Sequence, residues 1–143
     1  MKIQRTASAH WTGGSKDGIG LISTQSGALK SQPYGFATRF EGVVGTNPEE
    51  LIGAAHAGCF TMALSLILGE AGLTAESMET SATVSLESVD GGFAITAIHL
   101  KLVARVAGTN EATFKDLASK AKAGCPVSKA LSSVPITLEI EFT

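Results

Sequence analysis

A long, mostly apolar segment between Asn47 and Gly72 constrains the possible fold more than any other part of the sequence. Asn47 is a favourable N-cap residue, and Pro48 suits the first helical position because its missing N–H would have no partner there. Glu49 and Glu50 fall in the first turn, where the helix dipole favours negative charge. Gly72 is a natural C-terminal stop. We therefore predict one long helix that begins at Pro48 and ends just before this glycine.

The composition of this segment predicts a core helix rather than a membrane span. A transmembrane helix needs about 20 apolar residues with few interruptions. Polar or small residues interrupt this segment at His56, Thr61, Ser65, Gly69 and Glu70. The apolar side, at steps of three and four residues, is expected to consist of Ile52, Ala55, Cys59, Met62, Ala63, Leu66 and Ile67.

The rest of the chain predicts strands and shorter helices. Residues 3–11 and 20–24 are β-prone and flank a Gly-rich turn, and residues 81–89 and 93–106 alternate around Asp90-Gly91-Gly92, so each pair predicts a hairpin. Residues 32–35 are expected to form a turn or extended loop, and residues 38–41 a short strand or loop edge.

The C-terminal part predicts two helices and a final strand. A helix is expected over 110–123 with Asn110 as its cap, and Pro126 restarts a helix that runs to Leu131. A strand over 134–142 closes the chain. The whole pattern predicts one α+β domain over residues 1–143, with antiparallel sheets packed on a long central helix.

Composition and charge exclude several classes of protein. A chain of 143 residues can bury a core of ordinary size, so no metal or disulfide is required to hold it. The net charge of −2 carries no basic excess, so we expect no nucleic-acid partner. The first residues lack the apolar stretch of a secretory signal, and we expect a cytoplasmic protein without a membrane partner.

The two cysteines leave three interpretations open. In a reducing compartment a permanent bridge is not expected, so the pair is two inert core thiols, a reversible redox pair, or half of a metal site. Cys59 lies in the middle of the predicted helix, where a buried core thiol is the commoner case. Cys125 immediately precedes a new helix start at Pro126, where unpaired N–H groups lower a thiol pKa and favour the thiolate.

Three other side chains could take part in chemistry. His56 stands three residues before Cys59 and could supply a metal ligand or the base of a Cys–His hydrolase. No CxxC or HExxH spacing supports a metal, and a mid-helix position offers no oxyanion hole. A structural histidine is therefore the favoured interpretation. Arg39 is either an ordinary surface cation or a cation beside a thiolate. Glu49 is either a carboxylate that interacts favourably with the helix dipole or the partner that orients Arg39 through a bidentate ion pair.

Several segments together resemble the OsmC/Ohr family. They are QPYGF at 32–36, TRFEG at 38–42, GTNPEELIGAAHAGCF at 45–60 and AKAGCPVS at 121–128. The resemblance covers essentially the whole chain, and it is closer to the osmotically inducible branch than to the organic-hydroperoxide-resistance branch. One departure is Gly58, where the family commonly has alanine, and this change removes no functional group.

The resemblance implies a thiol peroxidase of the oxidative and hyperosmotic stress response that prefers organic hydroperoxides. It implies an intertwined homodimer that needs no cofactor or metal. Cys59 matches the peroxidatic cysteine and Cys125 the resolving one, while Arg39 matches the activating arginine and Glu49 the carboxylate that holds it. The resulting disulfide is typically reduced by a dithiol on a lipoylated protein. An apolar substrate collar is expected from Phe36, Phe40, Phe60 and Met62.

Helix geometry adds an expectation about the subunits. Glu49 and Cys59 are ten helical residues apart, which is about 15 Å along the axis. An Arg39 paired with Glu49 therefore cannot easily reach Cys59 of the same helix, and we predict that this pair serves the partner subunit. Two alternatives stay open: a non-enzymatic redox sensor or ligand-binding module built on the cysteine pair, and a Cys–His hydrolase.

Overall fold

The computed structural model describes all 143 residues, and the contacts within the chain form two compact units. The first unit is Met1–Leu51 and the second is Ile52–Thr143. The long helix predicted from the sequence begins in the first and continues through the second. A single domain over the whole chain stays a prediction.

The first unit is built on a small antiparallel sheet. Its strands are β1 (Ala7–Thr12), β2 (Ile19–Thr24) and β3 (Gln32–Tyr34), in the order β1-β2-β3. The predicted hairpin is confirmed, although its first strand begins later than expected. The expected turn or loop at 32–35 is instead mostly strand β3. Pro33 fits there because β3 is an edge strand, where a missing N–H costs no ladder bond.

The prediction of a strand or loop edge at 38–41 was wrong. The segment belongs to a short helix, α1 (Phe36–Phe40). The Gly35 N–H donates to Thr38 Oγ1 at 2.9 Å, and the same hydroxyl donates to the Gly35 carbonyl at 3.1 Å. Threonine side chains that bond to nearby backbone stabilise turns and helix starts, and this local closure overrides the β propensity of the segment.

Helix α2 (Pro48–Glu70) begins as predicted. The Glu50 N–H donates to Asn47 Oδ1 at 2.8 Å, which is the expected cap bond. Past the helix end, Gly72 has a φ of 73°, the left-handed conformation that glycine adopts without strain. Both ends of the longest element were therefore readable from the sequence.

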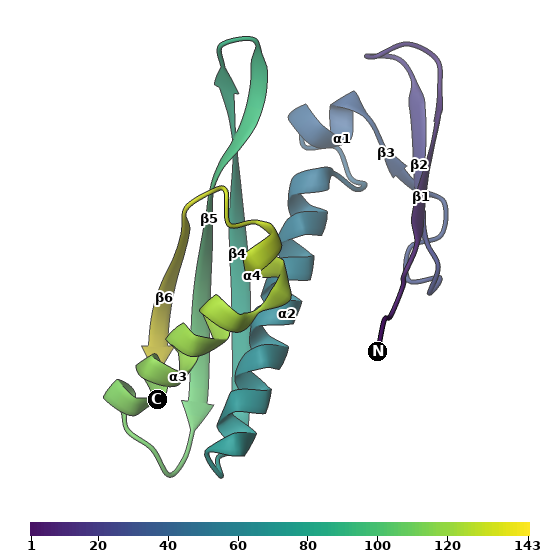
Figure 1. Ribbon diagram of the computed structural model, residues 1–143. Coiled ribbons are helices and arrows are strands. Elements are labelled where there is room, and N and C mark those ends of the chain that lie inside the picture. Colours follow the sequence, from purple (N-terminus) through teal and green to yellow (C-terminus); the bar gives the residue numbers. More distant parts are fainter. The chain divides into compact units, whose positions relative to one another are not determined.

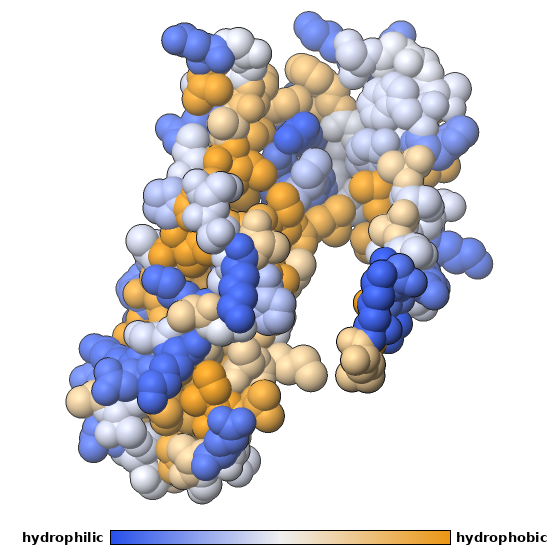
Figure 2. Space-filling model, in the orientation of Figure 1, coloured by the Kyte–Doolittle hydropathy of each residue, from blue (hydrophilic) through white to orange (hydrophobic).

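The predicted apolar side of α2 was right only in part, because Cys59, Ala63 and Ile67 pack against the core while other members do not. The buried positions are Gly53, His56, Phe60, Leu64 and Leu68. Two members of the predicted stripe, Met62 and Leu66, are 78% and 66% exposed. The helix is apolar around most of its circumference, so periodicity alone could not decide which side faces the core. The second apolar side stays uncovered within this chain, and apolar residues are visible on the surface of the molecule in Figure 2.

The second unit combines α2 with a three-stranded sheet and two further helices (Figure 1). The strands are β4 (Ala75–Val89), β5 (Gly92–Val106) and β6 (Ile136–Phe142), and the helices are α3 (Glu111–Gly124) and α4 (Pro126–Ala130). The β4–β5 hairpin turns at Asp90-Gly91 as predicted. A bulge leaves Thr96 without a cross-strand partner and accounts for the slipped alternation in the sequence.

The α+β class is confirmed, with one departure from antiparallel pairing. Strand β6 pairs parallel with β5. Helices α3 and α4 connect these two strands and return the chain to the end where β5 began, as a parallel pair requires. Cys125 lies in this crossover, between α3 and α4.

The core of the second unit lies between one face of the sheet and the two longer helices. Phe60, Leu64 and Leu68 of α2 and Phe114 of α3 pack against alternate residues of β5, which are Ile98, Leu100, Leu102, Ala104 and Val106. By length and composition α2 could cross a membrane, but this packing makes it the core helix of the unit. The core fixes the position of Cys59 on α2 relative to Cys125.

Candidate active site

The two cysteines lie next to each other in the second unit. Cys59 Sγ and Cys125 Sγ are 2.8 Å apart and share a hydrogen bond, although the residues are 66 positions apart in sequence. Both thiols are free, Cys125 is completely buried, and Cys59 is half-buried at the edge of the core. A covalent bond between the two sulfurs therefore requires only a small movement of the side chains.

Cys125 is held by the first turn of α4. It is the N-cap residue of this helix, and its sulfur accepts the Ser128 N–H at 3.5 Å. Pro126 follows it at the first helical position, as the sequence predicted. The backbone of Val127 acts to lower the pKa of both thiols. The start of α4 thus directs donors at the cysteine pair.

The surroundings of the pair favour negative charge on Cys125. Burial raises the pKa of the Cys59 thiol, and the hydrogen bond with Cys125 raises it further. Burial also acts to raise the pKa of Cys125, but the hydrogen bonds that Cys125 shares with Cys59 and Ser128 more than offset it, so that the Cys125 pKa lies below its usual value. No cation is among the groups that set either pKa.

His56 lies on the buried side of α2 but is bonded to neither cysteine. Its Nε2 lies 2.7 Å from the hydroxyl oxygen of Ser128, and both residues are buried. Burial lowers the pKa of His56, which keeps the ring neutral. No group of three or more metal-binding side chains includes this histidine or either cysteine. Ser128 is the last residue of the AKAGCPVS motif, but the motif assigned it no role, and its partner His56 lies 72 positions away.

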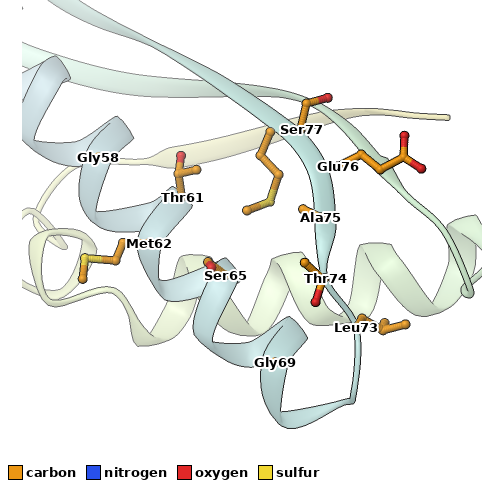
Figure 3. A pocket seen from close by; sticks show the side chains of 11 residues that line it. Gly58, Thr61, Met62, Ser65, Gly69, Leu73, Thr74, Ala75, Glu76 and Ser77 are labelled. Atoms are coloured by element: carbon orange, nitrogen blue, oxygen red, sulfur yellow. The ribbon is translucent and has the colours of Figure 1, made fainter.

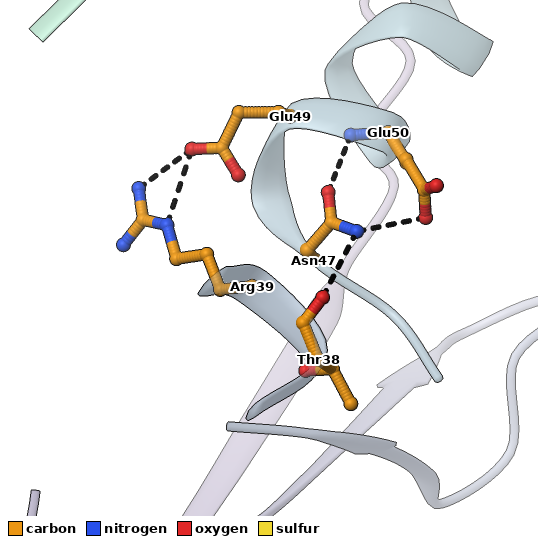
Figure 4. A network of polar contacts seen from close by, with 5 residues as sticks. All are labelled: Thr38, Arg39, Asn47, Glu49 and Glu50. Atoms are coloured by element: carbon orange, nitrogen blue, oxygen red, sulfur yellow. Dashed lines mark hydrogen bonds and ion pairs between the residues drawn. The ribbon is translucent and has the colours of Figure 1, made fainter. Parts of the chain in front are cut away.

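Arg39 and Glu49 form an ion pair within the first unit (Figure 4). Arg39 Nη2 donates to Glu49 Oε1 at 2.7 Å, and Arg39 Nε donates to the same oxygen at 3.2 Å. The expected pairing is therefore present, but one carboxylate oxygen receives both bonds instead of two oxygens receiving one each. Glu50 next to it receives Asn47 Nδ2 at 2.8 Å, so the two neighbouring carboxylates have separate partners.

An aromatic hollow of about 300 Å³ surrounds the arginine. Its lining includes Arg39, Phe36 and Phe40, together with Trp11 and Tyr34. Phe36 and Phe40 are in contact, with ring centres 4.9 Å apart and ring planes tilted by 47°, and the guanidinium lies 5.5 Å from the centre of the Phe40 ring. Two members of the expected substrate collar thus line this hollow.

The other two members of the expected collar lie elsewhere. Phe60 is completely buried in the core of the second unit and is not available to a substrate, so its prediction was wrong. Met62 is exposed and lines a groove of about 710 Å³ between α2 and the start of β4 (Figure 3). The helix side of this groove also includes Gly58, Thr61 and Ser65.

Comparison with known proteins decides the family. The protein-family model with the description "OsmC-like protein" matches residues 40–141 of this chain. The chain belongs to the OsmC-like family. It is 59% identical to Peroxiredoxin OsmC of Escherichia coli over 142 residues, which are 99% of each chain. The resemblance seen in the sequence motifs is therefore confirmed.

Relatives from the second branch of the OsmC-like family are more distant. Identity to the organic hydroperoxide resistance protein OhrB of Bacillus subtilis is 31% over 124 residues, or 85% of this chain and 89% of that protein. The crystal structure of OhrB matches with a TM-score of 0.71 over 95% of this chain and 98% of that one. An organic hydroperoxide resistance protein OsmC from Legionella pneumophila matches with a TM-score of 0.72 at 27% identity, covering 97% of each chain. The greater similarity to Peroxiredoxin OsmC confirms the predicted branch.

Proposed function

We propose that this chain reduces organic hydroperoxides to alcohols, with Cys59 as the attacking thiolate and Cys125 as its disulfide partner. Its 59% identity to a peroxiredoxin makes it a peroxiredoxin-like peroxidase, and the organic hydroperoxide resistance relatives support the choice of substrate. The observation that carries the proposal is the 2.8 Å separation of two free sulfurs. Inert core thiols have no need of this contact.

In the first step the Cys59 thiolate attacks the distal oxygen of the hydroperoxide. A sulfur–oxygen bond forms, the oxygen–oxygen bond breaks, and the alkoxide leaves and takes up a proton to give the alcohol. The sulfur loses two electrons and becomes a sulfenic acid. Cys59 is suited to this step because, of the two cysteines, only its side chain is partly exposed.

In the next two steps the sulfenic acid is removed and the enzyme is regenerated. Cys125 attacks Cys59 Sγ, the disulfide forms, and the hydroxyl leaves as water after taking up a proton. An external dithiol then reduces the bridge by two exchanges and is itself oxidised to a disulfide. We propose a lipoylated protein as the reductant, on the family resemblance.

Arg39 completes the site from a second subunit. The groups around the cysteine pair favour charge on Cys125, and no cation among them favours charge on Cys59. A guanidinium brought next to Cys59 would lower its pKa and polarise the peroxide. Because α2 is one helix that carries both Glu49 and Cys59, we propose that Arg39, held by Glu49, acts on Cys59 of a partner in a homodimer.

The uncovered side of α2 supports this assembly. Met62 and Leu66 are largely exposed, and Gly58 and Gly69 on the same helix leave open space where a side chain would be. Small residues allow close approach of another chain, and exposed apolar residues favour its burial. The aromatic hollow around Arg39 would then contact the alkyl part of the substrate. We propose a cytoplasmic location because the reaction consumes external thiols.

The test is steady-state reduction of tert-butyl hydroperoxide and of hydrogen peroxide, with dihydrolipoamide and thioredoxin compared as reductants. We expect faster turnover of the organic substrate, loss of turnover in Cys59→Ser, and a single turnover that leaves a trapped sulfenic acid in Cys125→Ser. Full turnover in Cys59→Ser would overturn the proposal. A redox sensor, the main alternative, would react once and show no repeated turnover with either reductant.

Dilution tests the role of the partner. If Arg39 acts across the interface, activity per chain should fall as the dimer separates. Mixing two inactive variants, Arg39→Ala and Cys59→Ser, should restore part of the activity because mixed dimers contain one complete site. A separated monomer with full activity would contradict the proposed arrangement.

A further inference from the structure

A buried histidine that has no part in the steps above is connected to the cysteine pair through one hydroxyl. His56 is completely buried, and its Nε2 lies 2.7 Å from Ser128 Oγ. Ser128 in turn contacts Cys125: its backbone N–H donates to Cys125 Sγ at 3.5 Å, and its side chain acts to lower the pKa of the same thiol. The groups thus form a continuous chain from His56 through Ser128 to Cys125 and on to Cys59.

The second ring nitrogen of His56 decides the direction of this chain. Nδ1 is buried and has no hydrogen-bond partner. A neutral imidazole carries one N–H and one lone pair. A buried N–H without an acceptor is rarer in proteins than an unsatisfied acceptor, so the proton belongs on Nε2. Nε2 then donates to Ser128 Oγ, and the hydroxyl hydrogen of Ser128 is free to point at Cys125 Sγ.

We propose that His56 and Ser128 are positioning residues that hold the negative charge on Cys125 during the two thiol-exchange steps. This inference rests on the proposed function, in which Cys125 first attacks Cys59 and later leaves it. A chain with every donor directed toward Cys125 stabilises its thiolate, whereas the opposite orientation would leave that sulfur without the hydroxyl bond. Neither residue gives up a proton in this scheme, because both act only as hydrogen-bond donors.

The chain affects disulfide formation and disulfide reduction. In the first, the Cys125 thiolate bonds to Cys59 Sγ as the sulfur–oxygen bond breaks and hydroxide leaves. In the second, a thiolate of the external dithiol bonds to Cys59 Sγ, and Cys125 leaves with the electron pair of the broken sulfur–sulfur bond. In thiol–disulfide exchange, the sulfur whose thiolate is more stable is the faster leaving group. The chain therefore directs the reductant to the half-exposed Cys59 and makes the buried Cys125 the leaving group.

Few other groups can influence Cys125. The titratable side chain that faces it directly is Cys59 of α2, and His56 acts through Ser128. Lys122 in the last turn of α3 and Lys129 in α4 are the nearest cations in sequence, and neither is among the groups that set the Cys125 pKa. The effect of the histidine and serine should therefore be measurable on its own.

The test titrates Cys125 alone. In a Cys59→Ala background, the ultraviolet absorbance of the thiolate is followed against pH with Ser128 intact and with Ser128→Ala. Loss of one hydrogen bond to a charged group should raise the midpoint by about one pH unit, which is about a tenfold smaller thiolate fraction below the midpoint. His56→Leu should shift the midpoint in the same direction. His56→Gln, whose amide N–H can replace Nε2–H, should restore most of it.

Unchanged midpoints in both Ser128→Ala and His56→Leu would overturn the inference. A second measurement needs no variant that could misfold: nitrogen NMR of the native protein should find the His56 proton on Nε2, and a proton on Nδ1 would also overturn it. With both cysteines present, Ser128→Ala should consume its first equivalent of hydroperoxide at the native rate. It should form the disulfide about threefold more slowly, because the greater nucleophilicity of a more basic thiolate offsets part of the tenfold loss in thiolate fraction. If the native protein reduces no hydroperoxide, the proposed function fails, while the titration still decides the role of His56 and Ser128.

Discussion

Glu49→Gln is expected to weaken the proposed activation of Cys59 without disturbing the fold. In the structure, two N–H groups of Arg39 converge on the single oxygen Oε1 of Glu49, at 2.7 and 3.2 Å. An amide oxygen in the same place can accept both bonds, but it lacks the negative charge. The change therefore keeps the shape of the contact and removes the charge that holds the guanidinium in place.

The size of the effect follows from these two bonds. In Glu49→Gln both bonds keep their charged donor, so what is lost is the attraction between the two opposite charges. The Arg39 side chain is 36% exposed, and ion pairs in contact with solvent contribute up to about 1 kcal/mol. We expect a net loss of about 1 kcal/mol in positioning, which lowers kcat/KM about fivefold. Glu49→Ala, which removes both acceptors, should cost more.

The adjacent carboxylate provides a matched control. Glu50 has the same charge and lies in the same helical turn, but it is bonded to Asn47 and not to Arg39. Glu50→Gln should therefore keep kcat/KM for tert-butyl hydroperoxide within about twofold of the native value. Steady-state assays with dihydrolipoamide measure both variants, and thermal unfolding checks that both are folded. Equal losses in the two variants would refute the reasoning, because the helix dipole and not the ion pair would then explain them.

Four other changes test the fold and the buried histidine. Leu64→Ala, in the core, should lower the free energy of unfolding by about 2–5 kcal/mol. Leu66→Ala, on the exposed side of α2, should change it by less than about 0.5 kcal/mol in a dilute sample. Chemical denaturation measures both variants, and similar losses would contradict the assignment of the buried and exposed sides of α2. Asn47→Ala removes the cap of α2 and should cost about 1 kcal/mol, so an unchanged denaturation midpoint would count against the cap. Because burial lowers the pKa of His56, the unfolded chain takes up more protons than the folded chain as the pH falls below the ordinary value of 6.5, and stability present above that pH is lost below it. In His56→Gln, the free energy of unfolding should therefore fall less steeply with decreasing pH below 6.5. The same steepness in the variant and the native protein would contradict this prediction.

The sequence predicted those parts of the fold that depend on local chemistry. The starts of α2 and α3 follow from Asn47 and Asn110. Each of these residues caps its helix by accepting the backbone N–H of the residue three positions further on. The β4–β5 turn follows from Asp90-Gly91, and the break before α4 follows from Pro126. These signals act over a few residues, so they can be read without knowing what packs against them.

The sequence could not predict what depends on distant partners. The buried side of α2 was predicted only in part because both sides are apolar, and only the sheet shows which side is covered. The parallel pairing of β6 depends on the path of the crossover. For the site, motif resemblance singled out Cys59 and Cys125. It assigned no role to Ser128, the last residue of the second motif, whose link to His56 arises from packing across 72 positions.

The short distance between two sulfurs that stand 66 positions apart has a consequence for the durability of the chain. Once joined, they close a large ring in the unfolded polypeptide, and loop-closure entropy for a ring of this size corresponds to about 4 kcal/mol. In each round of the proposed cycle the protein would alternate between an open chain and a cross-linked one. The oxidised form, which accumulates when reductant is scarce, would then be the form that best withstands heat and denaturants.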